Sequence, residues 1–175
     1  MLFRSRRSST DNTQRIKHLL NNSKLKLVEG DITDISSIQN ILNTEHVDEI
    51  YNLAAQSHVG TSFKQPALTW DVTGKGCLNI LQSIVDLKLF NVRFYQASSS
   101  EMFGSSYDED IKNGVKYQNE NTKFMPNSPY AIAKCAAHYA VRMYRDAYNL
   151  HASCGILFNH EGPRRGENFV TKKII

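Results

Sequence analysis

The sequence predicts an α/β fold with a doubly wound, parallel sheet. Short apolar runs that are typical of strands alternate along the 175 residues with segments of helical periodicity, an order that favours right-handed β–α–β crossovers. Three of these runs end in polar clusters, at residues 56–58, 98–101 and 159–161. Because ligands of such sheets bind beyond the carboxyl ends of the strands, the three clusters are the first candidates for a functional site.

The composition fits one globular domain, with 41% hydrophobic and 22% charged residues. The net charge of +4 is too small to indicate nucleic acid as a partner. Three widely spaced cysteines without a CxxC pair indicate neither a metal site nor a disulfide framework, and they fit a reducing cytoplasm. No apolar run approaches the roughly 18 residues of a membrane span, so we expect no membrane, nucleic-acid or metal partner.

The first half of the chain begins as a basic, hydroxyl-rich loop and then alternates strand and helix signals. Arg6 and Arg7 could hold a phosphate, and a merely solvated basic segment is the alternative. The run EIYNLAA suits a strand that is buried between two helix layers. The predicted elements are a strand over residues 25–29, a helix over 35–43 capped by Asp34, and a strand over 49–55.

The second half continues the alternation and ends in a strand. Gly74 and Gly76 fall early in a predicted helix, where close packing against a strand or ligand is one explanation. Ser128 and Pro129 are typical of an N-cap and a first helical position. The predicted elements are a helix over residues 70–88, a strand over 92–97, a polar loop over 105–127, a helix over 130–150 and a strand over 153–158.

Tyr130 and Lys134 are the central pair of the predicted site. Four residues apart on a helix, their side chains lie on one face, so a phenol sits beside an ammonium group. A cation about 4 Å from the phenol would lower the pKa of the phenol by about 3 units at an effective dielectric near 20. On spacing alone such a pair is more often two surface neighbours, but the polar strand ends favour an active site.

Several phrases resemble a known family. The segments YAIAK from Tyr130, NLAA from Asn52 and the three serines from Ser98 look like those of extended short-chain dehydrogenase/reductases. The longer phrases GDITD, IYNLAAQSHV, FYQASSSEMFG and ILFNHEGPRRGENFVTKKI are similar to the GDP-mannose 4,6-dehydratase family. This resemblance runs from about Arg6 to the last residue and implies a Rossmann-like fold.

The resemblance also implies a reaction, the dehydration of GDP-mannose to GDP-4-dehydro-6-deoxymannose, with bound NADP as a hydride shuttle. Tyr130 would take the proton of the hydroxyl at carbon 4, supported by Lys134. Glu101 would remove the proton from carbon 5 and help to expel water from carbon 6. Ser99 stands where the family usually has Thr, and its hydroxyl can still hydrogen-bond the oxygen at carbon 4. Ser100 and Asn159 complete the implied contacts to the nucleotide sugar.

The resemblance assigns further residues to the cofactor and implies a homodimer or homotetramer. The implied roles are contacts to the 2′-phosphate, to the adenine, and to the pyrophosphate and nicotinamide ribose. The residues are Arg6, Arg7, Ser8 and Ser9 for the phosphate, Asp31 and Ile32 for the adenine, Leu53, Ala54, Ala55, Gln56 and Ser57 for the pyrophosphate and ribose, with Lys134, His160 and Arg165 completing the set.

Two features of the family have no counterpart in the sequence. No GxxGxxG turn lies near the start, and the chain stops before most of the portion that binds the GDP moiety in the family. We therefore expect residues 1–175 to be a partial NADP-binding domain that carries the catalytic residues, incomplete at both ends and inactive alone. The alternatives are a non-catalytic remnant that binds a nucleotide or a partner subunit, and a related dTDP-glucose dehydratase or 4-epimerase.

Overall fold

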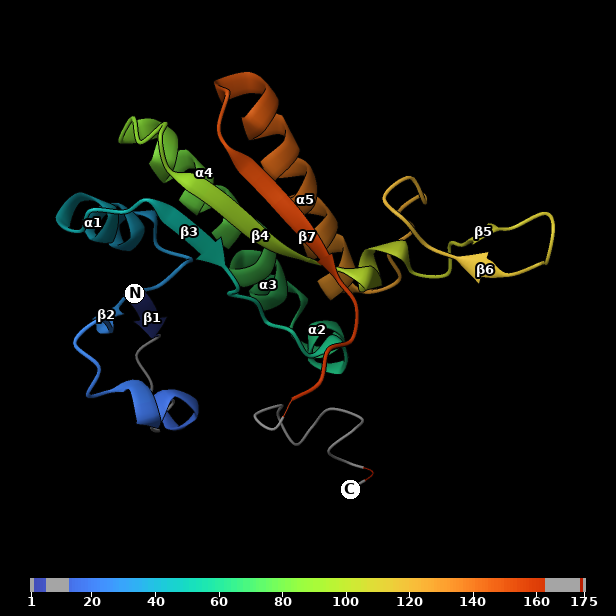
Figure 1. Cartoon of the computed structure of the whole chain (residues 1–175), viewed down its shortest axis with the longest axis horizontal. Coiled ribbons are helices and arrows are strands. Elements are labelled where there is room, and N and C mark those ends of the chain that lie inside the picture. The colour runs from blue at the N-terminus through green and yellow to red at the C-terminus, as the bar shows by residue number, and fades with distance from the viewer. Residues whose placement is uncertain (1, 6–12, 163–173, 175) are drawn as a thin grey trace. The chain divides into compact units, whose positions relative to one another are not determined.

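The computed structural model describes residues 2–5, 13–162 and 174 (Figure 1). The chain divides into two compact units, one formed by residues 1–30 with 159–175 and the other by residues 31–158. The larger unit holds the three-stranded sheet, the longest helices and most of the predicted site residues. None of the helices within the described ranges is long and apolar enough to cross a bilayer.

The smaller unit contains a two-stranded parallel ladder. Strand β1 (Leu2–Ser5) pairs in parallel with β2 (Lys26–Glu29), and a 3-10 helix, η1 (Gln14–Leu19), lies between them in sequence. The strand predicted over residues 25–29 is thus confirmed with a start one residue later. The prediction of a loop from residue 3 is wrong at β1, because four residues there extend and pair with β2 in register.

The larger unit is built on a parallel sheet with the order β3-β4-β7. Its strands are β3 (Glu49–Asn52), β4 (Arg93–Ser99) and β7 (Ala152–Leu157). The register places Asn52 beside Gln96, and Gln96 beside Cys154. This arrangement confirms the predicted parallel sheet, and the carboxyl ends of all three strands meet at one edge.

Helices pack against one face of this sheet, as Figure 1 shows for α4 (Gly76–Asp86) and α5 (Pro129–Tyr148). Apolar side chains from the helices and strands form the core between them. Its members include Ile80, Leu81, Ile84, Phe94, Ala137, Val141, Leu150 and Ala152. Helix α1 (Ile35–Thr44) packs on α4 and begins where predicted, because the Asp34 carboxylate accepts a hydrogen bond from the Ser36 N–H at 2.9 Å.

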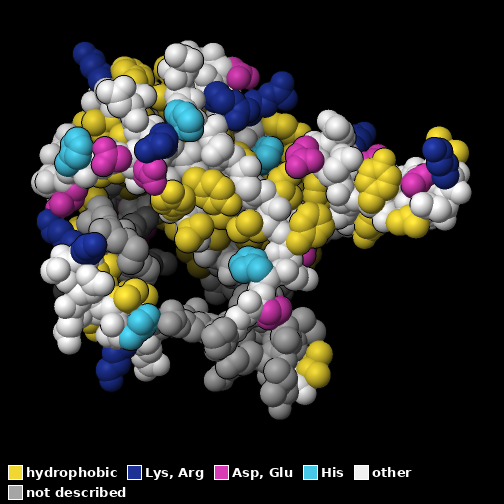
Figure 2. All heavy atoms as spheres, viewed as in Figure 1, with side chains coloured by type: hydrophobic (Ala, Val, Ile, Leu, Met, Phe, Trp, Pro, Cys, Tyr) yellow, Lys and Arg dark blue, Asp and Glu magenta, His cyan; other side chains and the backbone are white. Residues whose placement is uncertain are grey.

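The other face of the sheet is more open, so the expectation that β3 is buried between two helix layers is wrong. Side chains alternate along the strand: Asn52 is buried, whereas Tyr51 is 63% exposed. Leu53 and Leu157 are also exposed, and Figure 2 shows hydrophobic side chains gathered on the viewed face of this unit. Strand β3 also ends at Asn52, three residues earlier than the sequence predicts.

The predicted helix over residues 70–88 is interrupted. Within this range a π-helical turn, η2 (Trp70–Lys75), is followed by α4. Two short helices, α2 (Val59–Lys64) and α3 (Pro66–Thr69), precede η2. Close packing is confirmed at Gly76 alone, and its neighbour is the turn before α1 and not a strand. A Cβ on Gly76 would lie 2.8 Å from Cγ1 of Ile32, and one on Gly74 would lie 3.6 Å from the Ala133 carbonyl oxygen. Glycine at position 76 therefore lets α4 pack directly on Ile32.

The predicted loop over residues 105–127 contains a small hairpin arm. Its strands β5 (Asp108–Glu109) and β6 (Lys116–Tyr117) pair in antiparallel fashion, and Figure 1 shows the arm extending away from the sheet. A 3-10 turn, η3 (Ser100–Phe103), precedes the arm, and the Met125 N–H donates to the Met102 carbonyl oxygen at 3.0 Å where the chain returns. Gly104 between them has a φ of +57°, a conformation that glycine adopts without strain.

Candidate active site

The candidate site lies where β4, η3 and the start of α5 meet. The hydroxyl of Ser128 accepts a hydrogen bond from the Ala131 N–H at 3.1 Å, and Pro129 is the first residue of the helix. This cap confirms the predicted start of α5 and places Tyr130 in its first turn, with Lys134 one turn later on the same face.

Tyr130, Ser99 and Glu101 are brought together at the end of β4. Tyr130 is only 8% exposed, and the Ser99 hydroxyl lies close enough to its phenol to lower the pKa of Tyr130. The Ser99 hydroxyl in turn accepts the Glu101 N–H at 3.2 Å, which fixes the first turn of η3. The Glu101 carboxylate is close enough to act on the charge of Tyr130, and its side chain is exposed. A phenol, a hydroxyl and a carboxylate thus share one small region.

Lys134 is directed at the sheet and not at the phenol oxygen. The residue is 3% exposed. Its ammonium donates to the Ala97 carbonyl oxygen at 2.6 Å and lies 5.8 Å from the centroid of the Tyr130 ring. Burial lowers the pKa of Lys134 to about 8, and the nearby Cys77 opposes that shift. The ammonium is therefore held below the phenol ring, within the protein.

The predicted effect of Lys134 on Tyr130 is wrong for this arrangement. Burial raises the pKa of Tyr130 above its ordinary value, the hydrogen bond from Ser99 lowers it, and the Glu101 charge raises it. Desolvation of the phenolate is the largest of these causes, and the ammonium charge is directed to Ala97. In the protein alone the neutral phenol is therefore favoured.

The loop that follows β3 is held at both ends. The Asn52 side-chain oxygen accepts the Ala54 N–H at 3.2 Å, and the Gln56 N–H donates to the Thr73 hydroxyl at 3.1 Å. The Thr69 hydroxyl also donates to the Gln56 side-chain oxygen at 3.1 Å. Thr69 and Thr73 are buried in α3 and η2, so the π-helical turn anchors the segment that the sequence assigns to the cofactor.

Asp31 and Ile32 lie in the turn before α1. The Asp31 carboxylate accepts hydrogen bonds from the Thr33 N–H at 2.9 Å and the Thr33 hydroxyl at 2.7 Å. The Asn79 amide donates to the Ile32 carbonyl oxygen at 3.0 Å, and the Ile32 side chain is part of the core. The turn is thus fixed on α4, and adenine contact by these two residues stays a prediction.

The remaining predicted residues are not joined to this cluster by the structure. Asn159 and His160 are exposed and belong to the smaller unit, and Ser100 and Ser57 flank the site residues in sequence. Another group of the predicted cofactor residues lies outside the described part of the chain. These residues are Arg6, Arg7, Ser8, Ser9 and Arg165.

Sequence reasoning missed the polar side chains that support the site from below. Asn52 and Gln96 are buried in neighbouring strands, and Asn52 Nδ2 donates to Gln96 Oε1 at 2.7 Å. The sequence signal for both residues was a polar side chain next to apolar residues of a predicted strand. Such a side chain must find a hydrogen-bond partner when it is buried. Of the residues that the structure describes, no three His, Cys, Asp or Glu side chains gather as a metal site would need.

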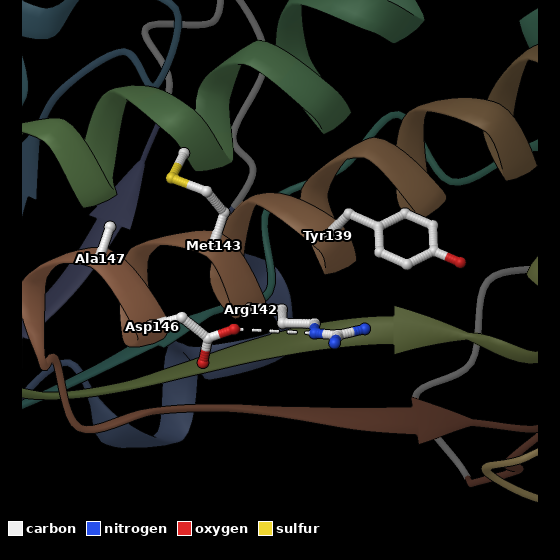
Figure 3. Close-up of a pocket in the computed structure, with 5 residues that line it drawn as sticks. All are labelled: Tyr139, Arg142, Met143, Asp146 and Ala147. Carbon is white, nitrogen blue, oxygen red and sulfur yellow. Dashed lines mark ion pairs between the residues drawn. The ribbon is translucent and has the colours of Figure 1, made fainter.

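A separate hollow of about 540 Å³ lies on the exposed side of α5 (Figure 3). It is lined by Tyr139, Arg142, Met143, Asp146 and Ala147. At 100° per residue, these side chains point about half a turn away from Tyr130 and Lys134. An exposed ion pair of 3.8 Å joins Arg142 to Asp146 within it. The hollow is therefore distinct from the candidate active site.

A parallel α/β unit with Ser99, Tyr130 and Lys134 at its carboxyl edge defines an extended short-chain dehydrogenase/reductase. Its fold matches that of a dTDP-glucose 4,6-dehydratase from Streptomyces venezuelae solved with NAD bound, with a TM-score of 0.84 and 25% identity over 98% of this chain and 50% of that one. It also matches RMD from Pseudomonas aeruginosa complexed with NADPH, with a TM-score of 0.71 and 24% identity over 89% of this chain and 53% of that one.

Sequence comparison narrows the class. The profile of the family described as GDP-mannose 4,6 dehydratase matches residues 2–175, and the chain belongs to this family. It is 49% identical to GDP-mannose 4,6 dehydratase 1 of Arabidopsis thaliana over 97% of this chain and 47% of that protein. The Drosophila melanogaster relative is 51% identical, with 97% and 43% covered, and the human relative is 48% identical, with 97% and 45% covered. The chain thus spans about half the length of these relatives.

Proposed function

We propose that the protein is a lyase that converts GDP-mannose to GDP-4-dehydro-6-deoxymannose, with NADP as its bound cofactor. The observation that carries this proposal is the cluster of Tyr130, Ser99 and Glu101 at the end of β4. The curated relatives from Arabidopsis thaliana, Drosophila melanogaster and human are named for this activity. The product would feed the synthesis of GDP-fucose or of another GDP-deoxysugar, in the cytoplasm.

The residues after β3 fit a dinucleotide cofactor. The loop over residues 53–57 is anchored by Asn52 and Thr73, and it leaves the apolar side chain of Leu53 66% exposed at the strand end. Solved structures of similar fold contain NAD or NADPH, so the choice of NADP rests on the family resemblance. When bound, NADP supplies a hydride acceptor and donor for the sugar and a positive charge beside the phenol.

Tyr130 is proposed to take the proton from the hydroxyl at carbon 4 of the mannose. Its buried phenol is neutral in the protein alone, and the Ser99 hydrogen bond is the group on this chain that favours the phenolate. The same hydroxyl can bond the oxygen at carbon 4, which aligns the sugar for proton transfer. Lys134 holds a buried positive charge under the ring of Tyr130.

Glu101 is proposed as the base at carbon 5 and then the acid at carbon 6. The ketone at carbon 4 acidifies carbon 5, whose proton passes to the carboxylate, and Glu101 then gives a proton to the hydroxyl that leaves carbon 6 as water. The carboxylate is exposed, and the Ser99 hydroxyl fixes its backbone N–H. One carboxylate can therefore serve both transfers of the elimination, and the proton that Tyr130 took from the hydroxyl is returned to the sugar at carbon 5, which balances the loss of one water.

The direct test is the conversion of GDP-mannose with added NADP by the complete protein that carries residues 1–175, followed by mass spectrometry for the loss of one water. Turnover by residues 1–175 alone would contradict the expectation that they are inactive alone. Glu101→Gln should stop this loss while leaving cofactor binding, measured by fluorescence titration, within about twofold. A matched variant in the exposed arm, Glu109→Gln, should convert the substrate at the parent rate. Three outcomes would favour the alternatives. If the protein is an epimerase, Glu101→Gln keeps its activity, and if it is a non-catalytic remnant, it binds NADP without turnover. If it is a dTDP-glucose dehydratase, it converts dTDP-glucose in preference to GDP-mannose.

The complete protein is proposed to work as a homodimer or homotetramer. Tyr139 and Met143 are half exposed on the outer side of α5, between the opposite charges of Arg142 and Asp146. If a second copy packs in antiparallel orientation, Arg142 of each copy meets Asp146 of the other. The outer side of α5 is therefore self-complementary in charge and offers apolar area for such a contact.

A further inference from the structure

Gln96 is an amide at the centre of the larger unit with no exposed surface. Its side chain is hydrogen-bonded at both ends: Oε1 accepts from Asn52 Nδ2 at 2.7 Å, and Nε2 donates to the Ala97 carbonyl oxygen at 3.0 Å. Burying an amide without partners would be unfavourable. The two bonds offset this cost and fix the orientation of the amide.

The Ala97 carbonyl oxygen has a second donor, the ammonium group of Lys134 at 2.6 Å. One carbonyl therefore binds both a side chain of its own strand and the buried ammonium of α5. At the other end of the chain of bonds, the Asn52 side-chain oxygen accepts the Ala54 N–H. The bonds run from the anchored loop after β3, through Asn52 and Gln96, to Lys134.

We infer that Gln96 is a positioning residue, which holds Lys134 under Tyr130 through the shared Ala97 carbonyl and links it to the loop after β3 through Asn52. A lysine side chain has a flexible stem of four carbons, and a hydrogen bond to a single carbonyl leaves many of its conformations accessible. The amide of Gln96 restrains the acceptor itself. Its effect on rate rests on the proposed function, whereas its effect on Lys134 does not.

The competing explanation is that Gln96 only links β3 to β4 and contributes stability. The two explanations differ at Lys134, because a merely structural amide leaves the ammonium environment unchanged when the fold is preserved. The titratable groups that act on Lys134 include Cys77 of α4, and the ammonium also faces the Tyr130 ring. Both side chains are kept in a Gln96 variant. Because Asn52, the partner of Gln96, also acts on the Cys77 thiol, the titration of Lys134 reports the amide together with this link.

The experiment labels lysine with ¹³C at Cε and follows the Lys134 signal by NMR against pH. Two variants test the amide. Gln96→Glu is nearly isosteric and keeps the acceptor for Asn52, but its carboxylate lies within reach of the ammonium, so the pKa of Lys134 should rise by at least about one unit. Gln96→Met fills the same space without an amide, so the Lys134 signal should shift or split as the ammonium samples more than one position.

Ser98→Ala is the matched control. Ser98 is buried in the same strand, and its hydroxyl bonds His138 Nδ1 at 3.0 Å and not the Ala97 carbonyl oxygen. This control should change thermal stability and leave the titration of Lys134 unchanged. In turnover assays, Gln96→Met should lower kcat about tenfold, equivalent to one hydrogen bond, and leave KM within about twofold.

The NMR measurement decides the inference whether or not turnover is seen. If both Gln96 variants are folded and Lys134 titrates as in the parent, Gln96 does not position Lys134. A protein without turnover in which the Lys134 signal responds to both variants would contradict the proposed function alone. Circular dichroism establishes folding. Gln96→Met is the deciding variant, because it removes the amide without adding a charge, and Gln96→Glu shows that the Lys134 signal responds to a charge at position 96.

Discussion

The inner and outer faces of α5 differ in burial and in the environment of their charged side chains. On the inner face, Lys134 is buried, and removal from water shifts its pKa toward neutrality. On the outer face, Arg142 and Asp146 remain in solvent and form an ion pair of 3.8 Å. Exposed pairs of this kind contribute about 0–1 kcal/mol to stability, because water and salt screen them.

One helix can thus hold a buried charge on one face and a solvated ion pair on the other. Because i, i+4 spacing aligns side chains, Tyr130 and Lys134 share the inner face, while Tyr139 and Met143 lie about half a turn away. A substitution on the inner face should therefore change rate and titration. A substitution on the outer face should change association, and the site should be preserved.

Tyr130→Phe should have the largest effect. It removes the proposed proton acceptor and keeps the ring under which Lys134 lies, so kcat should fall on the order of 10²–10⁴-fold. The initial rate of formation of the 4-keto product measures this effect. Tyr139→Phe on the outer face is the matched control and should retain the parent rate. Equal losses in both variants would contradict the division of the helix into two faces.

Lys134→Met should change the pH dependence of stability. The pKa of Lys134 is lowered to about 8 in the folded protein from its ordinary 10.5, so the folded state carries an unfavourable buried charge below pH 8. That penalty is relieved as pH rises from about 8 to about 10.5, because the unfolded chain then binds the extra proton. Relative to the Met variant, the parent should gain about 3 kcal/mol in unfolding free energy over this interval.

Urea unfolding at pH 7 and at pH 10.5, for the parent and Lys134→Met, gives the required difference. Lys75→Met, at the end of the π-helical turn, is the control in which an exposed lysine is lost. An unfolding free-energy difference for Lys134→Met that is constant across this range would contradict the burial of the charge.

Met143→Glu should affect assembly and leave the site intact. A carboxylate on the outer face, beside Asp146, adds like charge to the proposed contact between copies, so the equilibrium should shift toward monomer by at least about tenfold. Analytical ultracentrifugation measures the shift. Asn149→Asp, which adds the same charge beyond the end of α5, is the control. A variant that associates as the parent does would place the contact elsewhere.

Arg142→Ala should have the smallest effect on folding. It breaks an exposed ion pair within one helix turn, so the unfolding free energy should change by about 0.5 kcal/mol or less. Thermal unfolding at low and at 0.5 M salt should give differences that converge as the pair is screened. A loss well above 1 kcal/mol would indicate that this face is not solvated.

Local signals in the sequence were sufficient to predict where most helices and strands lie. They were insufficient to predict which groups on other elements the side chains contact. Ser128 and Pro129 predicted the start of α5 because capping depends on neighbouring residues alone. The position of the Lys134 ammonium depended on the Ala97 carbonyl, 37 residues away on another element. The spacing of Tyr130 and Lys134 alone could not reveal this acceptor, and the predicted contact between the ammonium and the phenol oxygen is therefore not observed.

The same limit applies to the strands and to the interrupted helix. An apolar run such as that of β3 is compatible with burial on one face or on two, and only packing distinguishes them. In the π-helical turn, the Thr73 hydroxyl accepts the Gln56 N–H, and this bond joins residues 17 positions apart. Periodicity alone carries no record of such a bond.

The closed base of the hairpin arm has a consequence for sequence variation. Met125 returns to Met102 by a backbone hydrogen bond, and any side chain at Gly104 would overlap the Met125 carbonyl oxygen, so the chain leaves and re-enters the domain at one point. Doubling the length of a flexible loop costs only about 0.6 kcal/mol. Insertions and deletions between residues 105 and 124 should therefore be tolerated among homologues, and an affinity tag inserted there should leave the spacing between Glu101 and Tyr130 in space unchanged.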